Sequence, residues 1–280
     1  MPIEQVAQSL GFINWTLLAA LAVGSFAAVV AARFRTEATK GYLGFTAFSA
    51  AAFAALAHLS DGGISTGAGD GFHSIAIDPA WETPRRLALA ALAALSLGYS
   101  VALFRGRRAV PVAAAGLAAA AAVLITAGLS WGGGGLASAL LALELGALSI
   151  GLGGVWAAMI LGHWYLVTPK LPEAPLVRVA RWLGLGLVLQ LTLFAAWIGF
   201  GAGPRGTPAF AALVGPWALL VWLRLLVGLV FPLIVTWAAV QTARSRSMES
   251  ATGLLYINVG TIAVGTILAA GLYFGAGVLV

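Results

Sequence analysis

Residues 136–167 read LASALLALELGALSIGLGGVWAAMILGHWYLV, an apolar stretch whose single Asp, Glu, Lys or Arg residue is Glu144. About 20 apolar residues are enough for a helix to cross a bilayer. Seven more apolar stretches fill most of the chain, and Arg224 is the second charged residue well inside one of them. The predicted spans are residues 10–32, 41–60, 87–104, 109–130, 136–167, 182–202, 211–243 and 252–279.

The composition of the 280-residue chain agrees with a membrane protein. Hydrophobic residues make up 61% of the chain, charged residues make up 9%, and the mean hydropathy is +1.00. A soluble domain typically has about 25% charged residues. Because backbone groups in hydrocarbon must bond one another, only helices and closed barrels span membranes, and the short alternating segments of a barrel are not seen. We therefore expect an all-α integral membrane protein, a bundle of about eight transmembrane helices in a single multi-pass domain over residues 1–280.

The basic residues between the spans indicate the orientation of the chain. One side holds eleven of the fifteen: Arg33, Arg35, Lys40, Arg105, Arg107, Arg108, Lys170, Arg178, Arg181, Arg244 and Arg246. The other side holds Arg85, Arg86 and Arg205 together with Glu4, Asp61, Asp70, Asp78 and Glu82. The positive-inside rule then predicts that both termini lie outside and the basic loops lie in the cytoplasm. We expect the bacterial cytoplasmic membrane.

Composition also excludes several partners and cofactors. The net charge of +6 comes from short basic clusters beside the spans, which favours the lipid bilayer over nucleic acid as the partner. With no cysteine, the chain has no disulfide, no Cys-ligated iron–sulfur cluster and no covalently attached haem. We also expect no metal site, because acidic and histidine residues do not recur at helical i, i+3 or i, i+4 spacing.

The longest connection between spans is a Gly-rich outer loop over residues 61–86. Its glycines are Gly62, Gly63, Gly67, Gly69 and Gly71. Two interpretations stay open, a flexible connector and a cap or docking surface over the outer mouth of the bundle. A second pattern, the similarity of residues 32–42 to residues 243–253, fits either a duplicated helical hairpin or the common chemistry of such turns.

Four polar residues on four spans are expected at similar depth. At 1.5 Å per residue, Glu144 lies roughly 28 Å above His163 and Arg224 lies roughly 30 Å above Arg244. By the same count His58 lies roughly 26 Å above Gly41, and Asn14 is 19 residues above Arg33. A polar layer near the outer boundary of the membrane is predicted: Asn14, His58, Glu144 and Arg224.

Glu144 and Arg224 are expected to pair, because an unpaired charge in lipid costs about 2.5–3.5 kcal/mol even on the mildest scale. One interpretation is an ion pair that only fixes the register of the helices. The other is a ligand or proton site, in which His58 and Glu144 exchange protons and Arg224 holds an anionic or carbonyl oxygen.

The histidines disfavour haem b, which needs two axial ligands at matching depth. His58 is expected near the outer face and His163 near the inner face, so His58 with His73 of the loop is the remaining combination. His163, Trp164 and Tyr165 form a run of amphipathic rings that is typical of an interfacial anchor.

Three classes of function remain. The first hypothesis is a membrane subunit of a respiratory or photosynthetic electron-transfer complex that binds quinone in the outer polar layer, while partner subunits carry the redox cofactors. The second is a small-solute or ion transporter or channel, with Gln190 beside the two charges. The third is a structural or assembly subunit without a site. Eight helices, outer termini and an outer polar site resemble the quinol-oxidising membrane subunits of the polysulfide-reductase type, in architecture and without a shared motif.

Overall fold

The fold is a helical bundle, seen here in a computed structural model. It describes residues 2–64, 75–105, 109–168, 170–201, 203 and 207–280. Eight helical segments of this part of the chain are long and apolar enough to cross a membrane. The predicted helical fold with eight long apolar helices is therefore confirmed for this part of the chain.

The first half of the chain forms α1 (Pro2–Gln8), α2 (Leu10–Arg35), α3 (Lys40–Asp61), η1 (Pro79–Trp81), α4 (Glu82–Phe104) and α5 (Val110–Trp131). The second half forms α6 (Gly135–Val167), α7 (Ala174–Phe200), η2 (Ala211–Leu213), α8 (Ala218–Leu225), η3 (Leu226–Val230), α9 (Phe231–Arg244) and α10 (Met248–Ala276). The segments α8, η3 and α9 together make one span.

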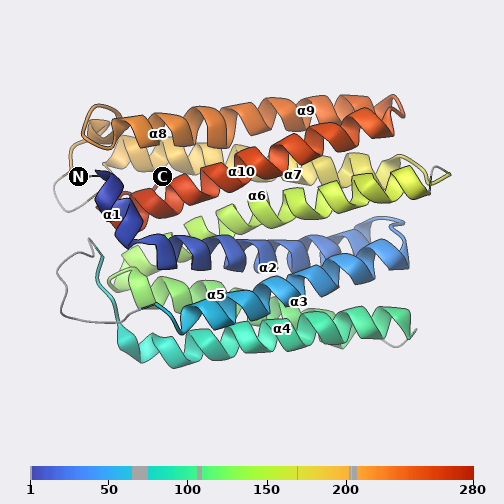
Figure 1. Cartoon of the computed structure of the whole chain (residues 1–280), viewed down its shortest axis with the longest axis horizontal. Helices are drawn as coiled ribbons and strands as arrows, with labels where there is room; N and C mark the ends of the chain where they lie inside the picture. Colours follow the sequence, from blue (N-terminus) through green and yellow to red (C-terminus); the bar gives the residue numbers. More distant parts are fainter. Residues whose placement is uncertain (1, 65–74, 106–108, 169, 202, 204–206) are drawn as a thin grey trace.

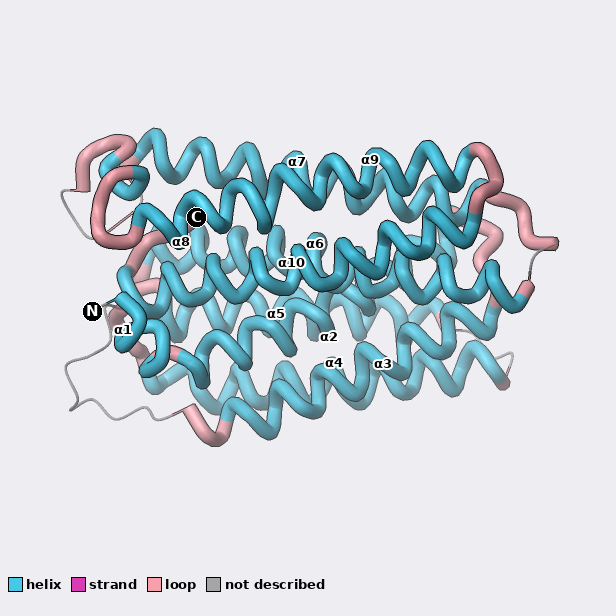
Figure 2. The backbone as a smooth tube through the Cα atoms, turned by 45° about the horizontal axis from the view of Figure 1, so that its top comes forward, coloured by secondary structure: helices cyan, strands magenta, loops and turns pink. Residues whose placement is uncertain are grey.

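The eight spans are arranged as two four-helix bundles that lie side by side (Figures 1 and 2). The first bundle contains α2, α3, α4 and α5, and the second contains α6, α7, α8–α9 and α10. The two bundles meet where α2 packs against α6 and α10, and where α5 packs against α6. Within each bundle, helices that follow one another along the chain are neighbours, and the connections are short turns except for residues 62–78 and residues 201–217.

Both termini lie at the same end of the structure, which we call the terminal end (Figure 1). The opposite end is the basic end. It carries most of the basic residues that the structure describes: Arg33, Arg35, Lys40, Arg105, Lys170, Arg178, Arg181, Arg244 and Arg246.

Glycines allow the helices of the bundle interfaces to approach closely. A methyl group on Gly24 of α2 would lie 1.7 Å from the carbonyl oxygen of Ser149, and one on Gly153 of α6 would lie 2.4 Å from Gly24. Small residues have this role in lipid because they let backbones pack directly. The contact between α2 and α6, which joins the two bundles, therefore requires glycine at both positions.

Three spans begin five or more residues away from their predicted starts. The seventh begins at Ala218 and not at residue 211, because residues 211–213 form the separate 3-10 helix η2. The helix α7 begins at Ala174 and not near residue 182, because its first turns carry Arg178 and Arg181, which apolarity alone places outside a span. The helix α4 begins at Glu82 and not at residue 87, because its first turns carry Arg85 and Arg86. Directly before Pro232 the seventh span contains the π-helical segment η3, since proline cannot donate the backbone hydrogen bond of a regular turn.

Candidate functional site

Glu144 and Arg224 form an ion pair inside the second bundle. The distance from Glu144 Oε1 to Arg224 Nη2 is 3.8 Å, and the two residues are 4% and 1% exposed. The predicted pairing is thus confirmed. Their helices are not neighbours in the bundle, because α7 and α10 lie between α6 and the span that holds Arg224 and contact both of them. The two side chains reach across the diagonal of the bundle.

The helices α6, α7 and α8 and the segment after α10 contribute to this charged centre. Trp197 of α7 donates its indole N–H to Glu144 Oε2 at 3.0 Å. Arg224 donates from Nη2 to Gln190 Oε1 at 2.9 Å, and Gln190 in turn donates to the carbonyl oxygen of Ala147 at 2.9 Å. The Nε–H of Arg224 points to the carbonyl oxygen of Val280 at 3.5 Å. The buried charges are therefore compensated by each other and by polar partners, as burial requires.

The room for the guanidinium group comes from a second close contact between glycines. A methyl group on Gly265 of α10 would lie 2.6 Å from the Cα atom of Gly228 in η3 and 3.1 Å from Arg224 Nη1. The side chain of Arg224 therefore occupies space that larger residues at these positions would fill. We infer that the close contact between Gly228 and Gly265 allows Arg224 to lie on the bundle axis.

A cavity of about 540 Å³ opens at the terminal end beside this centre. We call it the vestibule. Its walls come from both bundles and include the aromatic residues Trp131, Trp197, Phe200 and Tyr273, together with Ile75 and Leu279. Tyr273 also donates its hydroxyl to the carbonyl oxygen of Trp131 at 2.8 Å, which ties α10 to the end of α5.

One layer of side chains separates the vestibule from Glu144. Trp197 lines the vestibule and donates to Glu144, and Leu279 lines both the vestibule and a cavity of about 10 Å³ that touches Glu144. Gly277 has φ 69°, a left-handed conformation that glycine adopts freely, and it ends α10 so that residues 278–280 turn into the bundle. Leu279 and Val280 are 8% and 2% exposed.

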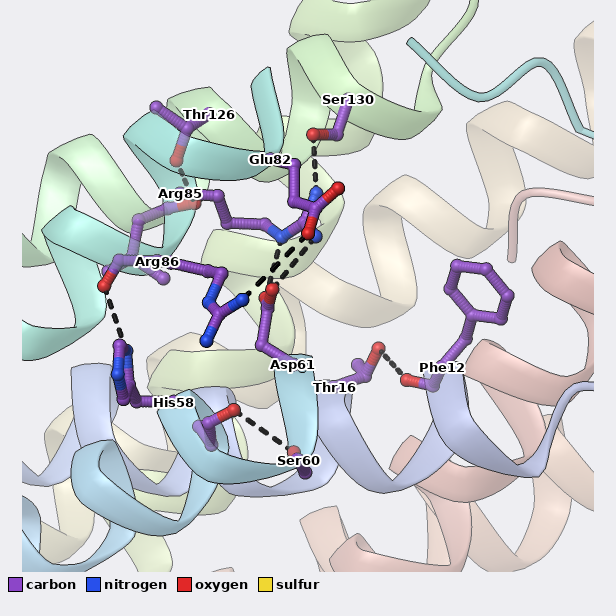
Figure 3. Close-up of polar contacts among 12 residues, drawn as sticks. Phe12, Thr16, His58, Ser60, Asp61, Glu82, Arg85, Arg86, Thr126 and Ser130 are labelled. Atoms are coloured by element: carbon purple, nitrogen blue, oxygen red, sulfur yellow. Dashed lines mark hydrogen bonds and ion pairs between the residues drawn. The ribbon is translucent and has the colours of Figure 1, made fainter. Parts of the chain in front are cut away.

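The first bundle holds a second buried ion pair, Asp61 with Arg85 (Figure 3). Arg85 donates from Nε and Nη2 to the two carboxylate oxygens of Asp61 at 2.7 and 3.0 Å, and from Nη1 to Ser130 Oγ at 2.5 Å. Its guanidinium carbon lies 4.3 Å from the ring centroid of Trp131, which is a cation–π contact. Since Trp131 also lines the vestibule, this pair supports one of its walls.

Hydropathy does not predict this pair, because it places Arg85 in the outer loop and Asp61 at the edge of that loop. In the structure, Asp61 is the last residue of α3, Arg85 is in the first turn of α4, and they are 1% and 2% exposed. The available signal was an acidic and a basic residue in the facing end turns of two consecutive spans.

The other two predicted site residues do not join Glu144 and Arg224. His58 lies in the first bundle, where its Nδ1 is 3.0 Å from the carbonyl oxygen of Arg86 (Figure 3). Asn14 is exposed on the surface of α2. Similar depth therefore does not bring these four side chains together, because they point in different directions around the bundle.

The three residues expected to form an interfacial anchor have different environments at the basic end. His163 is exposed, Trp164 packs against Gly41, and Tyr165 is 2% exposed and donates its hydroxyl to the carbonyl oxygen of Pro172 at 2.5 Å. His58 and His163 lie toward opposite ends of the bundle, and His73 is outside the described residues.

No group of three or more His, Cys, Asp or Glu residues that could hold a metal ion occurs in the part of the chain that the structure describes. Comparison with known proteins finds no matching family model, no matching curated protein and no matching solved structure. The chemistry of the vestibule and of its charged centre is therefore the basis for a functional proposal.

Proposed function

We propose that this chain is the membrane-embedded subunit of an electron-transfer complex and that its vestibule binds the headgroup of a quinone. The observation that carries the proposal is the aromatic vestibule with a buried carboxylate–guanidinium pair one side chain behind its wall. Small-molecule sites are typically concave, largely apolar and about 300–1,000 Å³ in volume, with a few polar groups that fix the ligand. The vestibule has these properties.

The walls suit a flat ring. Trp131 and Trp197 offer aromatic surfaces from the two bundles, and aromatic rings stack or pack edge to face with one another. The hydroxyl of Tyr273 and the indole N–H groups of Trp131 and Trp197 are the polar side-chain groups that its wall residues carry. A lipid-soluble headgroup is thus a better match to this cavity than a hydrated ion.

Reduction of a quinone to a quinol consumes two electrons and two protons, and oxidation of a quinol releases them. The electrons would pass to or from a haem or iron–sulfur centre in a partner subunit, since this chain has no cysteine to ligate a cluster. Glu144 is the acid beside the vestibule and would exchange one of the protons, and water at the open mouth of the vestibule would exchange the other. Arg224 would orient a carbonyl oxygen. Trp197 and Leu279 separate the vestibule from Glu144, so contact between the ligand and Glu144 would require one of these side chains to move.

The proposal includes the orientation of the chain. Most of the basic residues lie at the basic end, and the positive-inside rule would place that end in the cytoplasm. The vestibule would then open toward the outer face of the bacterial cytoplasmic membrane.

Transport of a small solute is supported less well. A transport path needs polar groups that are free to bind solute through the half of the bundle nearer the basic end. Asn258, the candidate there, donates to Pro232 O at 3.1 Å and to Thr236 Oγ1 at 2.7 Å, so its amide N–H groups brace the irregular seventh span.

A binding experiment tests the proposal. The full chain in lipid nanodiscs is titrated with a short-tailed benzoquinone and a short-tailed naphthoquinone while intrinsic tryptophan fluorescence is recorded. We expect saturable quenching, because Trp131 and Trp197 line the site. Ala137 also lines the vestibule, whereas Ala139 on the same helix is exposed and does not.

Ala137→Phe should weaken quinone binding at least roughly tenfold, because the added ring occupies the cavity, and Ala139→Phe should leave it unchanged. Absence of saturable quenching, or equal effects of the two substitutions, would contradict the proposal. Solute flux into vesicles that contain the chain alone would favour a transporter.

A further inference from the structure

A second cavity, of about 200 Å³, lies between α2, α6 and α7. We call it the lateral groove. The wall from α2 consists of Gly24, Ala27, Ala28 and Ala31, the wall from α6 of Ile150 and Gly154, and the wall from α7 of Val179, Trp182 and Leu183. These lining residues carry a single polar side-chain atom, the indole nitrogen of Trp182. The groove follows helices that span the membrane, so its natural occupant is an alkyl chain.

Two arginines continue the walls of the lateral groove toward the basic end. On α2, the spacing of Gly24, Ala28, Ala31 and Arg35 places all four residues on one face of the helix. On α7, Arg178 lies one turn before Trp182 on the same face. Arg178 also donates from Nη1 to the backbone carbonyl oxygen of Arg35, which brings the two arginines together at the mouth of the groove.

The guanidinium groups of both arginines can bind an anion. Arg35 and Arg178 are exposed, and no ion pair between described residues involves either of them. An arginine has five N–H donors, and the carbonyl oxygen of Arg35 accepts from one N–H of Arg178. Arg181 adds a third positive charge on the next turn of α7, and Glu37 is the nearby acid on the loop after α2. The mouth therefore carries a net positive charge.

We propose that the lateral groove is a binding site for an anionic phospholipid, with an acyl chain between α2, α6 and α7 and the phosphate between Arg35 and Arg178. The planar guanidinium group of an arginine can donate two parallel hydrogen bonds to a phosphate. Basic pockets between helices at the cytoplasmic face are suited to anionic headgroups. The site is separate from the vestibule, which lies at the other end of the bundle, and it does not depend on the quinone proposal.

Native mass spectrometry of the full chain tests this site, with phosphatidylglycerol and phosphatidylcholine of equal chain length as probes. We expect preferential retention of phosphatidylglycerol. The double substitution Arg35→Gln/Arg178→Gln should reduce that retention roughly tenfold or more, to the level of phosphatidylcholine. The matched control Arg33→Gln/Arg105→Gln removes two charges from the same end that do not continue a wall of the groove, and it should retain the preference.

A second variant tests the acyl chain. A methyl group on Gly154 would lie 3.8 Å from Leu183, so Gly154→Leu can be accommodated without a clash at Cβ and its branched end would fill the groove. We expect it to lose retained phospholipid while its melting temperature stays close to that of the unmodified chain. Equal retention by the Arg35/Arg178 variant and the unmodified chain would overturn the proposal. So would equal binding of both lipids, or displacement by glycerol phosphate at the same concentration as phosphatidylglycerol.

Discussion

Glu144 and Arg224 belong to spans that face each other diagonally across a four-helix bundle, and their side chains meet at 3.8 Å on its axis. Removing one partner leaves a buried charge with incomplete compensation. We expect Glu144→Leu or Arg224→Met alone to destabilise the fold by about 3–5 kcal/mol, and the double substitution to recover much of that loss. Thermal unfolding in detergent measures the stability of the two single variants and of the double variant.

The partly exposed pair of Glu82 and Arg86 provides the control for these single and double substitutions. Their charged atoms are 3.9 Å apart, but their side chains are 34% and 41% exposed. Neutralising either residue should change stability by no more than about 1 kcal/mol. If the single substitutions at Glu144 and Arg224 are harmless and additive, the buried pair makes no net contribution.

Substitution of Gly265 should disturb the placement of Arg224. The added methyl group of Gly265→Ala would clash with the Cα atom of Gly228 at 2.6 Å, and overpacking of this kind typically costs about 1–3 kcal/mol. Gly253 on the same helix has nothing within 4 Å of its Cβ position, so Gly253→Ala should be neutral or stabilise the helix by up to about 1 kcal/mol. Melting temperatures that fall equally in both variants would contradict the proposed close contact.

Replacing Arg85 with lysine should destabilise the fold, and replacing it with methionine should destabilise the fold more. Lysine keeps the charge but cannot donate to both oxygens of Asp61 and to Ser130 in the geometry of a guanidinium fork. Methionine leaves Asp61 buried without its partner, which we expect to cost about 3–5 kcal/mol. Thermal unfolding ranks the variants, and an Arg85→Met protein as stable as the unmodified chain would show that the pair is dispensable.

Leu279 should control access from the vestibule to Glu144. The chain has no cysteine, so Leu141→Cys introduces a unique thiol into the small cavity that touches Glu144. We expect this thiol to react slowly with a small methanethiosulfonate reagent and about tenfold faster when Leu279→Ala is added. The control Val155→Cys, fully buried on α6 and away from both cavities, should react equally slowly with and without Leu279→Ala.

Labelling of single cysteines tests the orientation proposed from the basic residues. Ala80 is exposed near the terminal end and Ser247 is exposed at the basic end. In intact cells, an impermeant maleimide should label Ala80→Cys, while Ser247→Cys should require permeabilisation. The opposite pattern would place the vestibule at the cytoplasmic face, and labelling of both from one side would contradict the eight-span fold.

Hydropathy was sufficient to predict the eight spans, because crossing a membrane demands long apolar helices wherever they occur. Depth counting also predicted the Glu144–Arg224 pair, since two charges at equal depth in lipid have few other partners. The direction in which a side chain points around its helix was not predictable in the same way. Helices in a membrane are apolar on all sides, so nothing in the sequence showed that Asn14 points outward or that His58 faces Arg86.

The rest of the site depends on end turns and on distant segments. The pair of Asp61 and Arg85 escaped prediction because hydropathy ends a span at the first charged residue, whether that residue turns inward or toward water. The vestibule is built from the ends of α5, α7 and α10 and from residues near Ile75, which are far apart in the chain. Spacing along a sequence carries no information about such a cavity.

The division into two bundles has a consequence for the order of events during synthesis. Asp61, Arg85 and Ser130 all precede α6, so the first bundle can neutralise its own charges before the second is made. Glu144, in contrast, precedes Arg224 by 80 residues, which corresponds to about 4–16 s of translation. During that interval the arginines already made in its own bundle, Arg178 and Arg181, lie at the basic end, so a nascent chain halted between α7 and α8 holds Glu144 without Arg224.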